Sequence, residues 1–273
     1  MTNHPPLHYL LDWAYDPVKM DEVLKNGADP NERYWKYEET ALHVAVRRRR
    51  LDCIDVLLSY GAAIDAKTKG GKTAYAHAIR RGFTEISDHL AALGADTGLN
   101  TADELAVVLC KHDLDQAQAI LATHPGLVVN MNAEEARILP DLAGRPMPAA
   151  VGLLLDAGID ITSRGLDEGT ALHMSAWFGQ LEVTRLLIAR NAPLDIQGDL
   201  HNMSPLGWVV HGSVYSGSAE SHKMDYAEIA RALLEAGASL AHPSEPEKDP
   251  HGSWLLEKVS KEVEKVLRAY GAR

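Results

Sequence analysis

The stretch GTALHMSAWFGQLEVTRLLIARNAPL, from Gly169 to Leu194, decides the fold of this chain. In its first half, small residues such as Ala171 alternate with larger apolar ones, which lets neighbouring helices approach closely. In its second half, Val183, Leu186 and Leu187 follow the i, i+3, i+4 spacing of an amphipathic helix. The stretch predicts two short helices, and one such pair cannot bury its apolar face without a neighbour.

The same unit recurs along the whole chain. A Gly-Ala pair, or a close variant, returns at steps of 32 to 34 residues, apart from one longer step of 46. The eight marks are Gly27-Ala28, Gly61-Ala62, Gly94-Ala95, Gly126-Leu127, Gly158-Ile159, Asn191-Ala192, Gly237-Ala238 and Gly271-Ala272. Glycine suits the end of a helix because it accepts the left-handed C′ conformation without a Cβ clash. The period predicts a solenoid of stacked repeats.

A second signature opens the first helix of several repeats. It lies 21 residues before the marks at Gly61, Gly94 and Asn191. Its copies are Thr40-Ala41-Leu42-His43, Thr73-Ala74-Tyr75-Ala76, Thr170-Ala171-Leu172-His173 and Ser204-Pro205-Leu206-Gly207. These tetrapeptides resemble the Thr-Pro-Leu-His signature of the ankyrin repeat. The resemblance covers nearly the whole chain, and the overall run, with its SPLGW segment at 204–208, is similar to a group of bacterial ankyrin proteins.

The resemblance implies an all-α solenoid of helix-turn-helix units with short β-hairpin finger loops. It also implies that the motif histidines, His43 and His173, hydrogen-bond to neighbouring backbone and serve structure rather than metal binding. Members of the family present a rigid concave face and projecting fingers to other proteins. We therefore expect a binding module rather than an enzyme.

The repeats are uneven along a single solenoid of residues 1–273. We expect a capping repeat at 5–30, two regular repeats at 31–97 and two degenerate repeats at 98–161. Two further repeats follow at 162–249, the second with an insertion at 211–225, and a capping repeat closes the chain at 250–273. His124-Pro125 and Arg145-Pro146-Met147-Pro148 interrupt the degenerate repeats, so the solenoid is expected to bend or lose cooperativity there.

Composition narrows the function further. The formal net charge of −11 disfavours a nucleic-acid partner and favours a protein with a basic surface. The basic run Arg47–Arg50 is interpreted as a solvated helix end.

No apolar run is long enough to span a membrane, and the N-terminus lacks the pattern of a signal peptide, which favours the cytoplasm. Cys53 and Cys110 are expected to be buried free thiols.

Three patterns associated with catalysis or metal binding are weak. The segment Ala66–Thr73 satisfies a relaxed phosphate-loop pattern, but it follows a helix end, so we expect a finger loop in which Lys72 is exposed and binds no nucleotide. The serines of the Gly/Ser segment near His211 and His222 lack a Gly-x-Ser-x-Gly elbow, which favours a solvated loop. No His-Glu-x-x-His or paired Cys-x-x-Cys occurs, so no metal and no cofactor are predicted.

The first candidate binding feature is the finger loop at 33–39, which carries Tyr34, Trp35 and Tyr37. Exposed aromatic side chains are costly, and tyrosine and tryptophan often dominate binding energy at interfaces. We expect these three residues to contact a partner. The alternative is that Trp35 and Tyr37 cover the next finger.

The second candidate is the insertion at 211–225, which includes His211 and Tyr215 and lies between the two helices of its repeat. Insertions in repeat proteins map to loops that often carry function. We predict a surface loop that is dispensable for folding and needed for binding. A passive loop is the alternative.

The third candidate is a stripe formed by equivalent positions of successive first helices. Arg47, Arg80, Trp177 and His211 each follow the first residue of their tetrapeptide by seven positions, on the side expected to be exposed. Trp208 extends this stripe, although it suits the core equally well.

These features together predict a scaffold, an inhibitor or immunity partner of a toxin, or an injected effector. The rival hypothesis is a ligand-binding or enzymatic pocket built by the insertion against Trp177, Trp208 and His211. A deep closed pocket there would favour the rival, and an open surface would favour the binding module.

Overall fold

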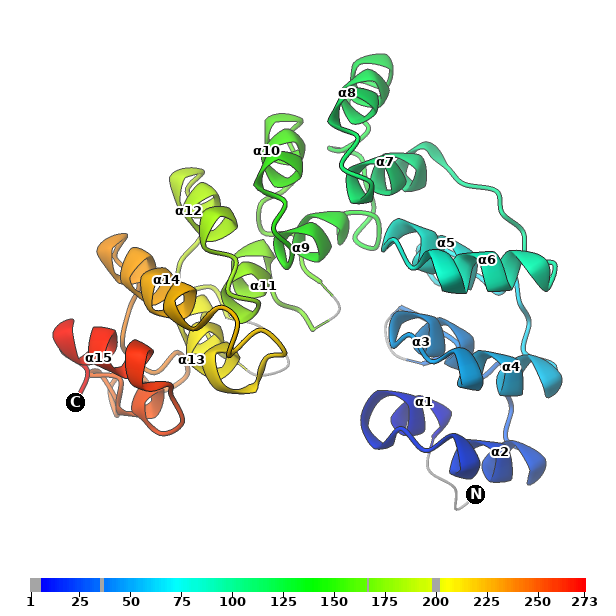
Figure 1. Cartoon of the computed structure of the whole chain (residues 1–273), viewed down its shortest axis with the longest axis horizontal. Coiled ribbons are helices and arrows are strands. Elements are labelled where there is room, and N and C mark those ends of the chain that lie inside the picture. The colour runs from blue at the N-terminus through cyan, green and yellow to red at the C-terminus, as the bar shows by residue number, and fades with distance from the viewer. Residues whose placement is uncertain (1–5, 35–36, 166, 198–201) are drawn as a thin grey trace. The chain divides into compact units, whose positions relative to one another are not determined.

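The computed structural model describes residues 6–34, 37–165, 167–197 and 202–273, apart from the side chain of Trp13. The chain forms two compact units, Met1–Asp113 (unit 1) and Leu114–Arg273 (unit 2). Each unit consists of short helices arranged in successive pairs (Figure 1). The boundary between the units falls between the two helices of the fourth predicted repeat, the first of the two degenerate repeats.

Unit 1 contains the first three helix pairs and the first helix of the fourth. Its elements are α1 (Leu7–Tyr9), η1 (Leu10–Ala14), α2 (Pro17–Lys25), α3 (Ala41–Arg47), α4 (Leu51–Ser59), α5 (Ala74–Arg80), α6 (Thr84–Ala92) and α7 (Thr101–Cys110). The first helices α3, α5 and α7 pack in a row. Apolar side chains from every pair up to α6 form one continuous core. This is the packing that the repeat period predicts.

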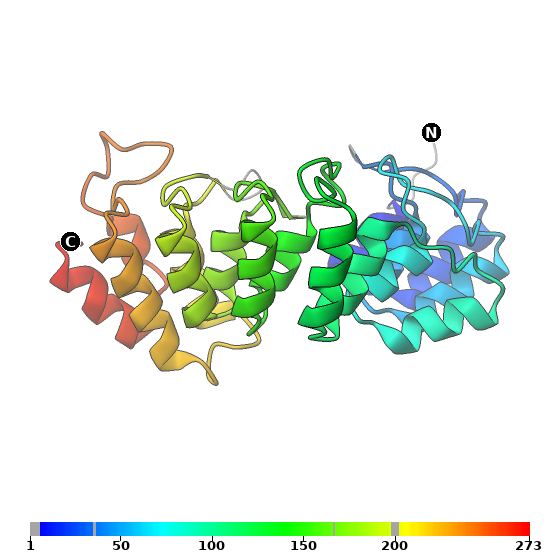
Figure 2. The ribbon, with the colours of Figure 1, turned by 90° about the horizontal axis from the view of Figure 1, so that it is seen from above.

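Unit 2 continues the series. Its elements are α8 (Leu114–Thr123), α9 (Ile138–Ala143), α10 (Pro148–Asp156), α11 (Ala171–Trp177), α12 (Leu181–Ala189), α13 (Pro205–Tyr215), α14 (Lys223–Glu235), η2 (Ser253–Leu256) and α15 (Lys261–Ala269). Figure 2 shows α10, α12 and α14 lying side by side, and these neighbours contact one another. Within each repeat the first helix packs against the second, as in α11 with α12 and α13 with α14.

The motif histidines bind each repeat to the loop that precedes the next. In unit 1, Nδ1 of His43 accepts the backbone N–H of Thr40 at 3.2 Å, so Nε2 carries the proton and donates to the carbonyl oxygen of Lys72 at 3.1 Å. In unit 2, His173 makes the same bonds to Thr170 and to Met203, at 3.1 Å each. The prediction that these histidines serve structure is confirmed.

The fourth repeat uses a different pair of residues for the same purpose. Asn100 accepts the backbone N–H of Asp103 at 2.9 Å, and the carboxylate of Asp103 faces the backbone N–H of Asn100 at 3.4 Å. This is a reciprocal cap at the start of α7. Asp103 therefore occupies the position that a histidine holds at His43 and His173, a substitution that lies outside the Thr-Pro-Leu-His pattern.

The finger loops are short, as expected. Among the described residues, antiparallel bridges join Tyr34 to Glu39 and Arg164 to Thr170. In the segment Ala66–Thr73, which satisfies the relaxed phosphate-loop pattern, the N–H of Thr68 donates to the carbonyl of Lys72 at 3.0 Å and closes a hairpin turn. Thr73 then caps α5 by accepting the N–H of Ala76 at 3.1 Å. The finger interpretation of this segment is confirmed.

The insertion is partly helical, because residues 211–215 belong to α13, residues 223–225 belong to α14, and residues 216–222 form the turn between them. α13 has 11 residues and α14 has 13, whereas α11 and α12 of the preceding repeat have 7 and 9. Most of the additional residues therefore lengthen both helices, and the turn of residues 216–222 takes up the rest. The expectation of a surface loop over all of 211–225 is therefore wrong, and only residues 216–222 lie outside the helices.

Candidate functional site

The finger at 33–39 does not present Tyr34 to solvent. Tyr34 is 6% exposed, its ring lies 4.3 Å from that of His8, and burial raises its pKa. The expected exposure is wrong because the core between the first two repeats takes up the ring. Tyr37 is half-buried, and its carbonyl accepts the N–H of Lys69 in the next finger at 2.9 Å. Trp35 lies outside the described residues.

Arg47 is a structural residue rather than an exposed one. Its guanidinium pairs with Asp12 through two bonds, at 2.8 and 2.9 Å, and with Glu39 at 3.3 Å. The Arg47 side chain is 5% exposed and both carboxylates are buried. This network ties η1 and the first finger to α3. The ion pairs of a buried arginine with two carboxylates are costly to break. Because Arg47 is buried in such a network, the expectation that it faces a partner is wrong.

Arg80 belongs to a second buried network. Nζ of Lys72 lies 2.8 Å from Oδ1 of Asp103, and Nε of Arg80 lies 3.2 Å from the same oxygen. All three residues are buried, and Lys72 is only 2% exposed. Both expectations of exposure, for Arg80 and for Lys72, are therefore wrong. The acidic partner comes from the following repeat, where sequence spacing alone did not predict a carboxylate.

A cavity of about 270 Å³ borders this network, lined by Lys67, Gly71, Lys72, Asn100 and Asp103 among others. Of its two lysines, Lys72 is already paired with the carboxylate of Asp103, which does not favour phosphate binding there. Among the residues that the structure describes, no group of three histidines, cysteines or carboxylates is placed to hold a metal ion.

In unit 2 one residue of the predicted aromatic patch lies in the core and two are half-buried. Trp208 is buried, with its ring 5.1 Å from that of His173 and 5.9 Å from that of Trp177. Of the two placements open for Trp208, the structure selects the core. Trp177 and His211 are half-buried, and the ring of His211 lies 5.8 Å from that of Tyr215. These rings pack on one another, which does not favour the rival hypothesis of a catalytic pocket.

The lengthened hairpin of α13 and α14 is held by close backbone contacts. A Cβ at Gly212 would lie 2.5 Å from the carbonyl oxygen of Trp177. The hydroxyl of Tyr226 donates to the same carbonyl at 2.6 Å and contacts the Ser216 hydroxyl at 2.5 Å. Ser213 is buried and accepts the N–H of Ser260 at 3.3 Å. The insertion is thus part of the folded unit.

The hairpin nevertheless carries exposed apolar side chains. Val214 is 41% exposed, Tyr215 is 54% exposed and Met224 is 64% exposed. We call these three residues the hairpin tip, since they lie where α13 ends and α14 begins. Of the nine side chains proposed from sequence for partner binding, Tyr215 is the one that belongs to this exposed set.

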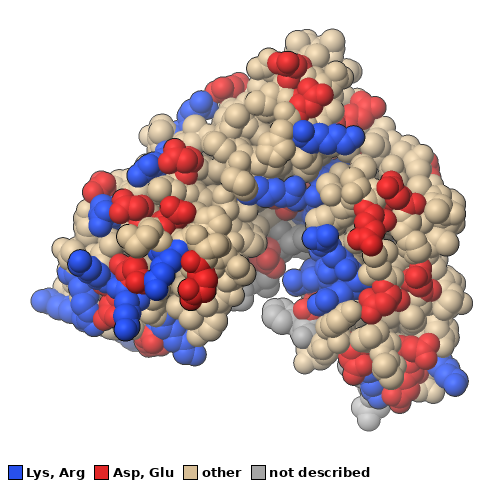
Figure 3. All heavy atoms as spheres, in the orientation of Figure 1, with Lys and Arg blue, Asp and Glu red and all other residues tan. Residues whose placement is uncertain are grey.

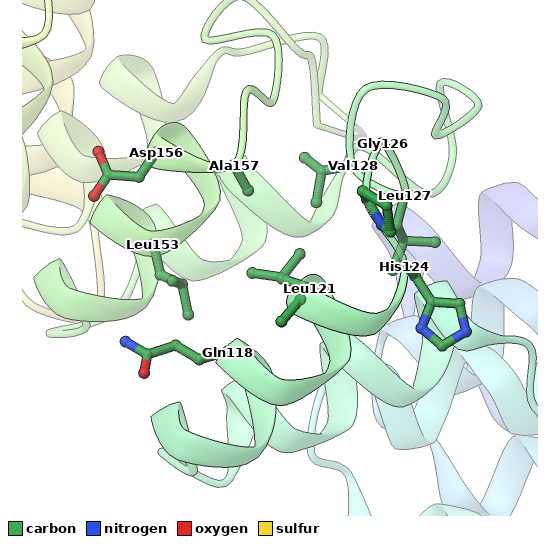
Figure 4. A pocket seen from close by; sticks show the side chains of 11 residues that line it. Gln118, Leu121, His124, Gly126, Leu127, Val128, Leu153, Asp156 and Ala157 are labelled. Atoms are coloured by element: carbon green, nitrogen blue, oxygen red, sulfur yellow. The ribbon is translucent and has the colours of Figure 1, made fainter.

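Two further cavities lie in unit 2. One of about 380 Å³ lies between α8 and α10, and Leu121, Leu127, Val128 and Leu153 point toward it (Figure 4). The other, of about 270 Å³, lies between α14 and α15 and includes Met224. In the described part of the chain, neither of these cavities is lined by Trp177, Trp208 or His211.

The two cysteines differ in burial. Cys53 is buried, which together with the neighbouring Asp52 raises its pKa to about 12. Cys110 is only partly buried, contrary to expectation, and its thiol donates to the carbonyl of Arg80 at 3.0 Å.

Within the described ranges, every helix is too short or too polar to cross a membrane.

Comparison with known proteins supports the repeat assignment. Models of ankyrin repeats match residues 7–101 and 139–213. An ankyrin repeat protein of fowlpox virus, FPV244, is 26% identical over 55% of this chain and 23% of its own length. The E3 ubiquitin-protein ligase KEG of Arabidopsis thaliana is 26% identical over 74% of this chain and 11% of its length. Human protein phosphatase 1 regulatory subunit 27 is 36% identical over 23% of this chain and 41% of its length.

This chain thus spans less than half the length of each of these relatives. Solved structures with similar folds include the ankyrin repeat domain of Bcl-3, at 20% identity and a TM-score of 0.34 over 76% of this chain and 94% of that one. Human ASB11 has 19% identity and a TM-score of 0.38 over 86% of this chain and 99% of that one. The helix pairs, the motif histidines and the family models agree, and the chain belongs to the ankyrin-repeat family.

Proposed function

We propose that this chain is a non-enzymatic protein-binding module whose binding surface includes the hairpin tip of unit 2. Ankyrin repeats in general are protein–protein interaction modules, because stacked repeats present rigid, extended surfaces. A scaffold or an inhibitor would both use such a surface. The finer assignment to the hairpin tip depends on the structure of the lengthened hairpin.

The observation that carries the proposal is exposed apolar area on a rigid support. Val214, Tyr215 and Met224 are each more than 40% exposed, although the helices that carry them are anchored by buried hydrogen bonds. A rigid surface loses little conformational entropy on binding. Tyrosine and methionine are also enriched at the centres of protein interfaces. This combination favours a binding role over a passive one.

The charge of unit 2 favours a partner with a basic surface. Most of the excess of acidic over basic residues lies in this unit. Glu220 is exposed and Asp225 half-exposed in the hairpin itself, while Glu228 lies on α14. Such charges accelerate association with an oppositely charged partner.

We further propose that binding takes place in the cytoplasm and regulates the partner. Two free cysteines are compatible with a reducing compartment. The name of the human relative describes a regulatory subunit of a phosphatase, a role that a binding module performs without catalysis of its own.

The test is a comparison of two double variants as bait in the native cell. Tyr215→Ala with Met224→Ala removes the hairpin tip, and Tyr9→Ala with Val18→Ala removes exposed apolar side chains of unit 1 as a matched control. We expect the first variant to lose a protein that wild type and control both retain. With that protein purified, its Kd should rise at least about tenfold for the first variant. Equal retention by all three proteins would refute the assignment.

A further inference from the structure

Three successive helix–helix turns of unit 1 carry basic side chains, although the chain as a whole is acidic. Arg48, Arg49 and Arg50 follow α3, Arg81 follows α5, and Lys111 and His112 follow α7. We call these six residues the basic ridge. Figure 3 shows Lys and Arg side chains gathered over α3. The equivalent turn after α11 in unit 2, Phe178–Gln180, contains no basic residue.

The three turns contact one another, so the ridge is continuous. The guanidinium of Arg49 lies over the ring of Phe83, 5.1 Å from its centre, which joins the first turn to the second. The thiol of Cys110 donates to the carbonyl of Arg80 at 3.0 Å, which joins the end of α7 to the end of α5. The three turns therefore lie next to one another along one edge of the unit.

Several of these cationic side chains are positioned to bind an anion. Arg48 pairs with Asp12 at 2.7 Å and remains 39% exposed. Arg49 is exposed, and Arg50 stacks on Tyr15, 3.4 Å from its ring centre. Stacking uses the face of a guanidinium and leaves its N–H edge for an acceptor.

Neighbouring groups show how far the charge is balanced. Nε of Arg50 is buried and has no hydrogen-bond acceptor among the described residues. Two exposed acids of α4 lie near the ridge and are engaged elsewhere. Asp52 accepts the hydroxyl of Tyr15 at 2.9 Å, and Asp55 contacts His89 at 2.6 Å.

The backbone gives an independent indication. Arg49 has a φ of 56° and His112 a φ of 60°, in the left-handed region that favours glycine. The equivalent turn positions hold Gly82, at φ 71°, and Gly179, at φ 67°. A side chain at this position strains the backbone, and strain of this kind is concentrated at functional sites. Two turns of the ridge carry a basic side chain where glycine would be relaxed.

We propose that the basic ridge binds an extended acidic segment of a partner protein, with carboxylates at about every third residue. Packed helices lie about 8–10 Å apart, which sets the spacing of the turns. An extended chain rises about 3.3 Å per residue, so three residues match that spacing. A short acidic segment covers the ridge alone, whereas a long nucleic acid would also meet the acidic surface around it. The ridge does not depend on the hairpin tip.

The test is fluorescence anisotropy with a labelled peptide of five Glu-Gly-Ser repeats, and with a Lys-Gly-Ser peptide of equal length as control. The full-length protein should bind the acidic peptide alone, and raising the salt from about 50 to about 200 mM should weaken binding. Arg49→Glu with Lys111→Glu should raise the Kd at least about tenfold. Lys258→Glu with Lys261→Glu makes the same charge change at exposed sites of unit 2 and should alter the Kd less than about twofold.

A second variant separates binding from folding. Arg49→Gly with His112→Gly removes the side chains and relieves the strain, so it should weaken binding at least about tenfold while raising the Tm. A lower Tm with unchanged affinity would make both residues structural and overturn the proposal. So would equal loss of binding in the unit 2 control, absence of peptide binding by the wild type, or tighter binding of a single-stranded RNA of equal charge.

Discussion

The two units build the same repeat with different side chains. In unit 1, buried ion pairs join neighbouring repeats, as in Arg47 with Asp12 and Lys72 with Asp103. In unit 2, aromatic rings and hydroxyl groups occupy the corresponding region, with Trp177, Trp208 and Tyr226 packed together. A buried charge is destabilising once its partner is removed, whereas an aromatic contact loses only its own packing. The repeat motif therefore specifies the backbone and leaves the contacts between repeats to vary.

The comparison predicts its largest effect at Asp103. Asp103→Asn keeps a hydrogen-bond acceptor at the start of α7 but leaves the cations of Lys72 and Arg80 buried without their carboxylate. We expect a loss of about 3 kcal/mol in the free energy of unfolding by urea. Asp55→Asn, which breaks an exposed pair with His89, should cost less than about 1 kcal/mol. Equal effects of the two substitutions would show that the buried network does not hold unit 1 together.

The next effect depends on pH and belongs to unit 2. Burial lowers the pKa of His173 from 6.5 to about 4, so the unfolded chain binds this proton more readily than the folded one. The stability that His173 contributes is complete above about pH 6.5 and falls as the pH drops toward 4, by up to about 3 kcal/mol. Urea melts between these pH values should show a smaller dependence for His173→Asn. An NMR titration of His173 near its ordinary pKa of 6.5 would contradict the prediction.

The smallest effect is expected at one turn position, which holds a glycine in each of the two units. In Gly179→Ala of unit 2, the new Cβ would lie 2.8 Å from Cβ of His222, so crowding adds to the strain of a positive φ. In Gly82→Ala of unit 1, the nearest atom, on Cys110, is 3.8 Å away, and only the strain remains. We expect losses of about 2 and about 1 kcal/mol respectively, measured by thermal unfolding. A greater loss for Gly82→Ala would reverse the assignment of tight packing to unit 2.

Sequence reasoning was most reliable where an interaction is local. The cap of α5 by Thr73 and the bonds of His43 and His173 within their own motifs involve residues three positions apart. Such patterns repeat with the period of the fold and need no knowledge of the neighbouring repeats. The same reasoning identified Ala66–Thr73 as a finger rather than a phosphate loop, which the hairpin turn confirms.

Sequence reasoning failed where burial depends on another repeat. Arg47 meets Asp12 from a position 35 residues away, and Lys72 meets an aspartate that replaces the motif histidine of the next repeat. Tyr34 was expected at a loop tip, but it lies against His8 of the preceding repeat. A charged or aromatic residue at a fixed repeat position is exposed or buried according to the residue opposite it, and a single repeat does not contain that residue.

The period, the number of helix pairs, the helix-ending marks and the bond of each motif histidine to its own threonine were determined by the sequence itself, because each is set within one repeat or by its recurrence along the chain. Tertiary structure decided the conformation of the insertion at 211–225, where both flanking helices are lengthened and Gly212 and Tyr226 pack against the carbonyl of Trp177. That contact joins residues 49 positions apart, and only the folded chain brings them together. The exposure of Tyr215 and Met224 follows from the same contact, since side chains on lengthened helices are directed by the packing of the helix rather than by local propensity.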